Sequence, residues 1–283
     1  QAEDGIRDDL VTGVQTCALP ILLEHPEFTE EHFSGVRTIG YGAAAMPVAV
    51  LQRLLKPGGP DFSGGYGMTE LSGSVSFLDA QGHRAALAGQ PHLLESVGKP
   101  VPGVEIRLAA DDEGADTTAS TVEMGEILIR GPQVMAGYWG DSQATADTLH
   151  DGWLHTGDIG RFDESGNLYI VDRKKDMILT GGENVASREV EEVLASHPDI
   201  SRAAVVGLPD NKWGETVCAL VVAAPGRELG AGQVAAHCRD YLAGYKVPRQ
   251  VLIADELPVN ANGKIDKQRI RGLIIAHRQR GEK

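Results

Sequence analysis

Short apolar runs alternate with polar turns along the amino-terminal half of the chain. The run Val36–Tyr41 leads into Gly42 and a turn of small residues, after which apolar residues follow Pro47 with helical spacing. This order predicts a buried strand, a tight turn and a helix that begins near Pro47. Three further runs predict strands, namely Val104–Leu108, Glu126–Arg130 and Leu168–Asp172. The polar stretch Asp111–Thr121 is predicted to be a surface loop.

The pattern changes beyond Arg173 to short strands mixed with amphipathic helices. Ser187 is expected to cap a helix with the apolar residues Val190, Val193 and Leu194 on one face. A second amphipathic helix is predicted around Val234–Leu242. Strands are predicted at three apolar runs, Met177–Leu179, Ala203–Val206 and Val217–Val222. The charged stretch Asp172–Lys175 separates the two patterns and is the predicted domain boundary.

Residues Gln1–Ile21 fit neither a helical period nor a strand alternation. They resemble a translated sequencing adapter, because adapter codons read without a mismatch into Gln1–Asp8 and again into Val11–Ile21. Such a segment is set aside before the fold is considered, so natural sequence is expected to begin near Leu22.

Charge and cysteine usage exclude several classes of function. The chain has 283 residues and a formal net charge of −14, which disfavours nucleic acid and anionic membrane as partners. No apolar run is long enough to span a bilayer, and no secretory signal is evident. The three cysteines, Cys17, Cys218 and Cys238, are too widely spaced for a metal site, and a reducing cytoplasmic setting fits them best.

Five motifs occur in a characteristic order and spacing. They are Tyr66–Glu70, Gly125–Ile127 through Gly137–Trp139, His155–Asp158, Asp172–Arg173 through Gly181–Asn184, and Pro258 through Gly263–Lys264. On these motifs the chain resembles the adenylate-forming superfamily and, within it, the acyl-CoA synthetases, from about Leu22 to Ile274.

The resemblance implies an α/β architecture of two domains. Residues 22–172 would be the remainder of a large adenylate-forming amino-terminal domain, and residues 173–283 a small mobile α+β domain, with the hinge at Lys175. It also implies ATP, Mg²⁺ and coenzyme A, with a small-molecule carboxylic acid as substrate and an acyl-adenylate as intermediate. The oligomeric state is left open.

The same resemblance assigns residues to the nucleotide. Tyr66 would stack on adenine, Thr69 would donate to the α-phosphate, and Glu70 would bind Mg²⁺. Asp158 and Arg173 would contact the ribose, since an ionised Asp only accepts hydrogen bonds. The remaining nucleotide contacts would be Gly42, Ala43, Gly67, Met68 and Ile170.

By this resemblance, Lys264 matches the lysine that bridges acid and nucleotide in the family, and Thr69, Glu70 and Lys264 form the expected catalytic set. Coenzyme A would pass Thr180, Gly181 and Gly182, because glycines leave room for pantetheine. Trp213 lies where relatives contact coenzyme A, although a core or rim tryptophan explains it equally well.

Three alternatives accompany this interpretation. The residues of the motifs resemble those of ligases for medium- or long-chain fatty acids, so such an acid is the expected substrate. Aryl and short branched acids are the alternatives. Amino-acid-activating domains share Asn262–Asp266 but differ around Tyr66 and after Asp172. No Ser/Thr/Gly-rich phosphate loop is found, so the chain alone is expected to adenylate poorly, and a non-catalytic adenylate- or CoA-binding remnant is the rival from another class.

Overall fold

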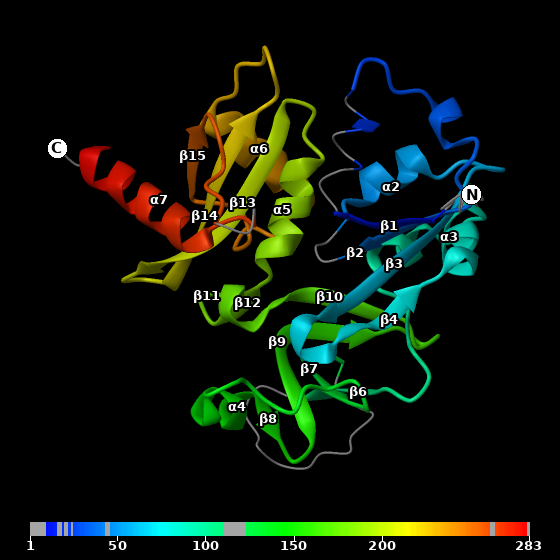
Figure 1. Ribbon diagram of the computed structural model, residues 1–283. Coiled ribbons are helices and arrows are strands. Elements are labelled where there is room, and N and C mark those ends of the chain that lie inside the picture. Colours follow the sequence, from blue (N-terminus) through cyan, green and yellow to red (C-terminus); the bar gives the residue numbers. More distant parts are fainter. Residues whose placement is uncertain are drawn as a thin grey trace. The chain divides into compact units, whose positions relative to one another are not determined.

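The computed structural model describes residues 10–15, 19, 22–23, 25–42, 46–109, 123–260 and 264–281. The chain divides into two compact units, Gln1–Ile170 and Val171–Lys283, which are described separately (Figure 1). The predicted loop Asp111–Thr121 and the residues Ala43, Asn262 and Gly263 lie outside the described ranges.

The first unit contains two sheets and short helices. One sheet has the order β1 (Leu10–Gln15), β2 (Thr38–Gly42), β3 (Asp61–Met68), β4 (Gly73–Leu78), β5 (Lys99–Pro100). The other has the order β10 (Leu168–Arg173), β9 (Trp153–Phe162), β7 (Gly125–Arg130), β6 (Glu105–Ala109), with β8 (Leu149–His150) paired to β9. The helical segments are η1 (Glu30–Phe33), α2 (Val48–Leu54), η2 (Thr69–Leu71), α3 (Ala80–Leu87), η3 (Pro91–Glu95) and α4 (Ser142–Thr148).

The strand and the helix predicted around Pro47 are confirmed, since β2 precedes α2 and Pro47 is the N-cap residue of α2. The turn predicted between them falls on residues outside the described ranges. Leu51 and Leu54 of α2 are buried against Ile39 of β2 and Phe62 of β3. Burying such aliphatic side chains stabilises the fold by roughly 1.5–3 kcal/mol each.

A second apolar cluster is shared between the two sheets of this unit. Leu71 and Val75, next to and within β4, are fully buried with Ile127 and Ile129 of β7 and Leu154 of β9. The cluster thereby fixes the loop after β3 against the strand β9, and these are the two segments that carry the motifs Tyr66–Glu70 and His155–Asp158.

The second unit is one sheet with helices on both faces. Its elements are η4 (Lys174–Asp176), β11 (Ile178–Thr180), β12 (Glu183–Val185), α5 (Ser187–Ala195), β13 (Ile200–Asp210), β14 (Gly214–Ala223), α6 (Ala231–Tyr241), β15 (Gln250–Ala254) and α7 (Lys267–Gly281). The strand order is β12-β11-β14-β13, with β15 parallel to β14.

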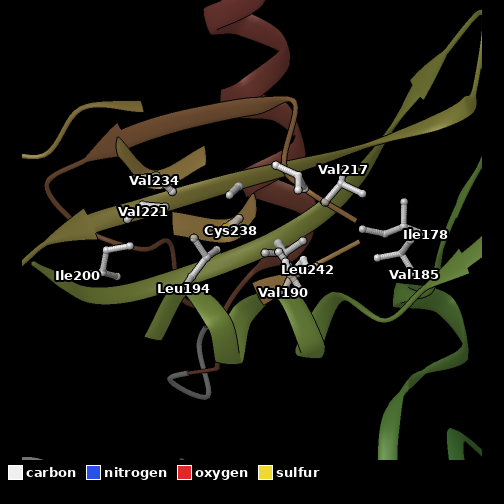
Figure 2. Close-up of a cluster of buried hydrophobic side chains, with 13 residues drawn as sticks. Ile178, Val185, Val190, Leu194, Ile200, Val217, Val221, Val234, Cys238 and Leu242 are labelled. Carbon is white, nitrogen blue, oxygen red and sulfur yellow. The ribbon is translucent and has the colours of Figure 1, made fainter. Parts of the chain in front are cut away.

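Both faces of this sheet are apolar because successive side chains of a strand point to opposite sides. Val205 of β13 joins the cluster with α5 and α6, which Figure 2 shows around Val190, Leu194 and Val234. Its neighbour Val206 joins the opposite cluster, where α7 contributes Ile270 and Ile274. The continuous apolar run predicted as a strand is therefore a strand that is buried on both faces.

Several features differ from the sequence prediction. The prediction that Ser187 caps α5 is wrong: Ala186 is the N-cap residue, and Ser187 is the first helical residue. The strands β13 and β14 extend beyond the predicted apolar runs, because their antiparallel pairing continues from Ile200 to Asp210. Leu10–Gln15, for which no element is predicted, form β1 by parallel backbone pairing with β2.

Cys218 and Cys238 are free, buried thiols within the described ranges. Burial raises the pKa of Cys218 to about 12 and that of Cys238 to about 11. Both thiols therefore stay protonated at neutral pH and act as small core residues, because the thiolate is the reactive form. In the part of the chain that the structure describes, no helix has both the length and the apolar character needed to cross a membrane.

Candidate active site

Tyr66 and Asp158, from motifs that are far apart in the sequence, meet in the first unit. The Tyr66 hydroxyl on β3 donates a hydrogen bond of 2.7 Å to Oδ2 of Asp158 on β9. Asp158 is only 4% exposed, so this hydrogen bond replaces part of the hydration that its side chain loses on burial. The pair places an aromatic ring next to an acceptor-only carboxylate, a combination suited to a base and a ribose.

The part of β9 that carries Asp158 is held by side chains of its own sheet. The Thr156 hydroxyl donates to the Ile127 carbonyl at 2.8 Å and accepts from the Asp158 amide at 3.1 Å. The carboxylate of Glu126, a largely buried residue on β7, accepts from the Gly157 amide at 3.1 Å. Glu126 is therefore a site residue that the sequence analysis did not single out, although it lies within the second motif.

Gly67 is required by the close approach of β4. A Cβ atom at Gly67 would lie 1.9 Å from the Gly73 carbonyl oxygen, where the β3–β4 register shifts. The sequence predicts a nucleotide contact for Gly67, and the packing of β4 is an additional reason for glycine at this position. Only glycine allows the two backbones to approach this closely.

Glu70 is linked to a second residue that sequence reasoning left without a role. Its Oε1 atom accepts a hydrogen bond of 2.9 Å from the Tyr138 hydroxyl, and its carbonyl accepts from the Met135 amide at 2.8 Å. The hydrogen bond to Glu70 raises the pKa of Tyr138. Tyr138 lies in the motif ending at Trp139, and that motif is the signal that identifies it. Thr69 is exposed beside Glu70 in η2.

Glu70 is the residue that would hold Mg²⁺ shared with a nucleotide, as predicted from the sequence. Within the described ranges, no group of three or more His, Cys, Asp or Glu residues stands together that could hold a metal ion. A single carboxylate is nevertheless a normal protein contribution to Mg²⁺, since substrate phosphates and water complete the octahedron.

Other predicted nucleotide contacts of the first unit surround the same strands. Gly42 pairs with Gly65 on the neighbouring strand, and a Cβ atom at Gly42 would lie 2.8 Å from the Gly65 carbonyl oxygen. Met68 and Ile170 pack with Tyr66 on the cluster shared by the two sheets. Ala43, the remaining contact, lies outside the described residues.

In the second unit, the predicted coenzyme A residues lie together. The Gly181 amide donates to the Trp213 carbonyl at 2.8 Å, and a Cβ atom at Gly181 would lie 3.0 Å from the Trp213 ring. Thr180 is buried next to Gly181, and Gly182 has a φ of +87°, which favours glycine.

Two cations flank the Trp213 ring. The Lys212 ammonium lies 4.7 Å and the Arg249 guanidinium 4.5 Å from the ring centroid. Cations over an aromatic face are attracted by its quadrupole. No local sequence pattern identifies Arg249, because it immediately precedes β15 and only the fold brings it to Trp213. The three side chains form an aromatic, positively charged surface.

Lys264 lies exposed in a loop that closes on itself. Its amide donates to Asn260 Oδ1 at 3.0 Å, and its carbonyl accepts from the Asn260 amide at 2.8 Å. Val259 and Ile265 pair in an isolated antiparallel β-bridge. Arg173 is exposed at the start of the same unit, and Lys175 lies in η4. Lys264, Arg173 and Lys175 all belong to the second unit.

Two family models match this sequence. The AMP-binding enzyme model matches residues 9–139, and the AMP-binding enzyme C-terminal domain model matches residues 189–264. The chain belongs to the AMP-binding enzyme family. The first match holds the motif Tyr66–Glu70 together with Tyr138, and the second holds Trp213 and Lys264. The first match overlaps the end of the segment that resembles an adapter, whose origin stays a prediction.

Relatives in the AMP-binding enzyme family include ligases for different acids. The chain is 41% identical over 265 residues to feruloyl-CoA synthase from Amycolatopsis sp, covering 94% of this chain and 52% of that protein. It is 42% identical to the long-chain-fatty-acid–CoA ligase of Yersinia pestis, covering 92% and 44%. The ATP-bound structure of MatB from Rhodopseudomonas palustris superposes with a TM-score of 0.81 at 30% identity, covering 92% and 50%. The chain thus spans about half the length of the relatives it matches.

Replacing Tyr66 with Phe tests the bond to Asp158 in this AMP-binding enzyme. The variant keeps the ring but leaves a buried carboxylate without one donor, so we expect the free energy of unfolding to fall by about 1.5–3 kcal/mol. Tyr138→Phe is the matched control, because it removes a hydroxyl whose bond to Glu70 is exposed, and we expect a loss below about 1 kcal/mol. Urea denaturation measures the free energy of unfolding of both variants. Equal losses would contradict the view that the Tyr66 hydroxyl stabilises the buried Asp158 carboxylate.

Proposed function

We propose that this chain acts in an ATP-dependent carboxylic acid–CoA ligase that works through an acyl-adenylate. The observation that carries the proposal is the hydrogen bond between Tyr66 and Asp158, which unites two separate motifs into a base-and-ribose site. Membership of the AMP-binding enzyme family and the names of its relatives support the same reaction.

In the first half-reaction, a carboxylate oxygen attacks the α-phosphorus of ATP, and the bond to the β-phosphate oxygen breaks to release pyrophosphate. Excess negative charge develops at phosphorus, so fixed donors and cations stabilise the transition state. The Thr69 hydroxyl donates a hydrogen bond to the α-phosphate, and the Lys264 ammonium neutralises negative charge between the acid and the nucleotide. Glu70 would hold Mg²⁺, which would supply positive charge next to the phosphates. Asp158 and Arg173 hold the ribose.

In the second half-reaction, the thiol sulfur of coenzyme A attacks the acyl carbonyl, the bond to the phosphate oxygen breaks, and AMP leaves as the thiol proton is lost. Gly181 and Gly182 leave space for pantetheine. Trp213 with Lys212 and Arg249 provides an aromatic, cationic surface for the nucleotide end of coenzyme A. Between the two half-reactions, the second unit rotates about Lys175. The rotation withdraws Lys264 from the reacting groups and brings in the strand at Thr180–Gly182.

For the acid, we propose a medium- or long-chain fatty acid, with an aryl acid as the alternative. Both classes are supported by relatives of nearly equal identity, since feruloyl-CoA synthase is 41% and the long-chain ligase 42% identical. The cytoplasmic location stays a prediction, and the oligomeric state stays open.

The test supplies the purified chain with an acyl-adenylate and coenzyme A. We expect decanoyl-AMP to be converted into decanoyl-CoA, measured by chromatography, and feruloyl-AMP to serve less well. AMP binding, measured by calorimetry, is expected to weaken about tenfold or more in Asp158→Asn, which removes a charged acceptor. Asp147→Asn is the matched control, because Asp147 is exposed and its carboxylate accepts a hydrogen bond from the nearby Gln143 side chain.

Each outcome separates the rival functions. Thioester formation supports the ligase, and the better adenylate identifies the class of acid. AMP binding without any thioester from either adenylate would replace the ligase with a non-catalytic binding protein. Equal AMP affinity in Asp158→Asn and in wild-type protein would remove Asp158 from the site.

A further inference from the structure

A partly buried polar cluster lies in the second unit, outside the residues that have been given roles. The Lys267 ammonium donates to the Ser187 hydroxyl at 2.6 Å and pairs with Glu191 Oε1 at 3.1 Å. Glu191 Oε1 also accepts from the Val205 amide at 2.8 Å. Ser187 is completely buried, and the Lys267 side chain is 19% exposed. These contacts connect α7, α5 and β13.

The cluster lies directly behind the loop of Lys264. Lys267 is the first residue of α7 and follows Lys264 by three positions. Between them, the Asp266 amide donates to the Pro258 carbonyl at 2.9 Å, which closes the base of the loop. A chain this short transmits a displacement of Lys267 to Lys264, because three residues span at most about 10 Å.

On its other side, the cluster reaches the strand end that carries Arg173. The Ser187 amide donates a short hydrogen bond to Asp172 Oδ2, and the Arg173 amide donates to Asp172 Oδ1 at 2.7 Å. Asp172 is buried, with 6% of its surface exposed. Ser187 thus bonds Lys267 through its hydroxyl and Asp172 through its amide, so one residue joins the Arg173 strand to the Lys264 loop.

Burial makes this connection sensitive to each partner. The side chains of Lys267 and Glu191 are 19% and 25% exposed, so the pair is largely withdrawn from water, and removal of one partner leaves the other charge poorly compensated. Burial also raises the pKa of Glu191, an effect that Lys267 opposes. A cluster of this kind has a defined geometry, since it is satisfied only when every hydrogen bond is made.

We propose that Lys267 is a positioning residue that holds Lys264 at a fixed place relative to Arg173. The ammonium of Lys267, anchored on Ser187 and Glu191, sets the start of α7 and thereby the base of the Lys264 loop. The inference rests on the proposed role of Lys264 toward the acyl-adenylate. It predicts that Lys267 affects the nucleotide only through Lys264.

The test is a double-mutant cycle on the full chain, with calorimetric binding of a non-hydrolysable acyl-sulfamoyl adenosine as the readout. We expect Lys264→Ala and Lys267→Met each to weaken binding about tenfold, and the double variant to be no weaker than Lys264→Ala alone, since residues that act through one another are not additive. Lys267→Arg should restore most of the affinity. Arg269→Met, which removes an exposed cation from the same helical turn, is the control and should bind normally.

The outcomes distinguish the two levels of the proposal. Additive losses in the double variant would overturn the positioning role, because Lys267 would then act independently of Lys264. Unchanged binding in Lys264→Ala would overturn the role of Lys264 itself, and with it this inference. If Lys267→Met fails to fold, as judged by circular dichroism, Ser187→Ala takes its place in the cycle. It keeps the ion pair and removes one acceptor, and the same non-additivity is required.

Discussion

Replacing Lys264 with Ala is expected to reduce adenylate formation by about 100- to 1,000-fold, the effect of losing one preorganised charge or donor at a transition state. Lys264 is exposed in a closed loop, so the variant should fold normally. Conversion of a supplied acyl-adenylate into acyl-CoA should persist, because Lys264 is proposed to act only before the thiol enters. ATP–pyrophosphate exchange, measured on the complete product of the gene that encodes this chain, tests the first step.

The control is Arg269→Ala, which removes an exposed cation of the same unit and should leave both steps unchanged. Equal losses in adenylation and in thioester formation would contradict the assignment of Lys264 to one half-reaction. They would also remove the reason for proposing rotation about Lys175, since a single arrangement would then serve both steps.

Replacing Gly67 with Ala is expected to lower the free energy of unfolding by about 3 kcal/mol, a loss typical of forcing atoms into a packed region. The new Cβ atom would lie 1.9 Å from the Gly73 carbonyl oxygen, and backbone atoms do not move aside cheaply. The β3–β4 pair must therefore separate where Thr69 and Glu70 follow, so AMP affinity should fall together with stability. Urea denaturation and calorimetry measure the two effects.

Gly40→Ala is the matched control for this prediction. Gly40 also lies in a strand of the same sheet, but a Cβ atom there meets nothing within 4 Å, and its φ is not in the left-handed region. We expect a change within about 0.5 kcal/mol, as for substitutions that touch nothing. If both variants lost the same stability, the close approach of Gly67 and Gly73 would not be what requires glycine.

The prediction from local pattern was successful where the interactions are local. Pro47 and the apolar spacing after it determine α2, because a fixed proline φ and a helical stripe act over a few residues. The motif Tyr66–Glu70 and the residues around Asp158 are likewise readable from the sequence, because each motif is contiguous. Their nucleotide roles remain proposals.

Local pattern was unsuccessful where a distant residue decides the structure. Ser187 is predicted to cap the helix, yet its amide donates to Asp172, which precedes β11 and β12, and Ala186 is the N-cap residue. The helix α7 has no counterpart in the sequence prediction, since its position is determined by packing of Ile270 and Ile274 on the sheet.

The sequence by itself determined the family resemblance, the order of the motifs and the identity of the candidate chemical groups. Only the tertiary structure decided which of those groups meet: Tyr66 with Asp158, Glu70 with Tyr138, Trp213 with Arg249, and Lys267 with Ser187 and Glu191. The physical reason is that each of these contacts joins residues far apart along the chain. Their distances depend on strand pairing and core packing, which no short window of sequence specifies.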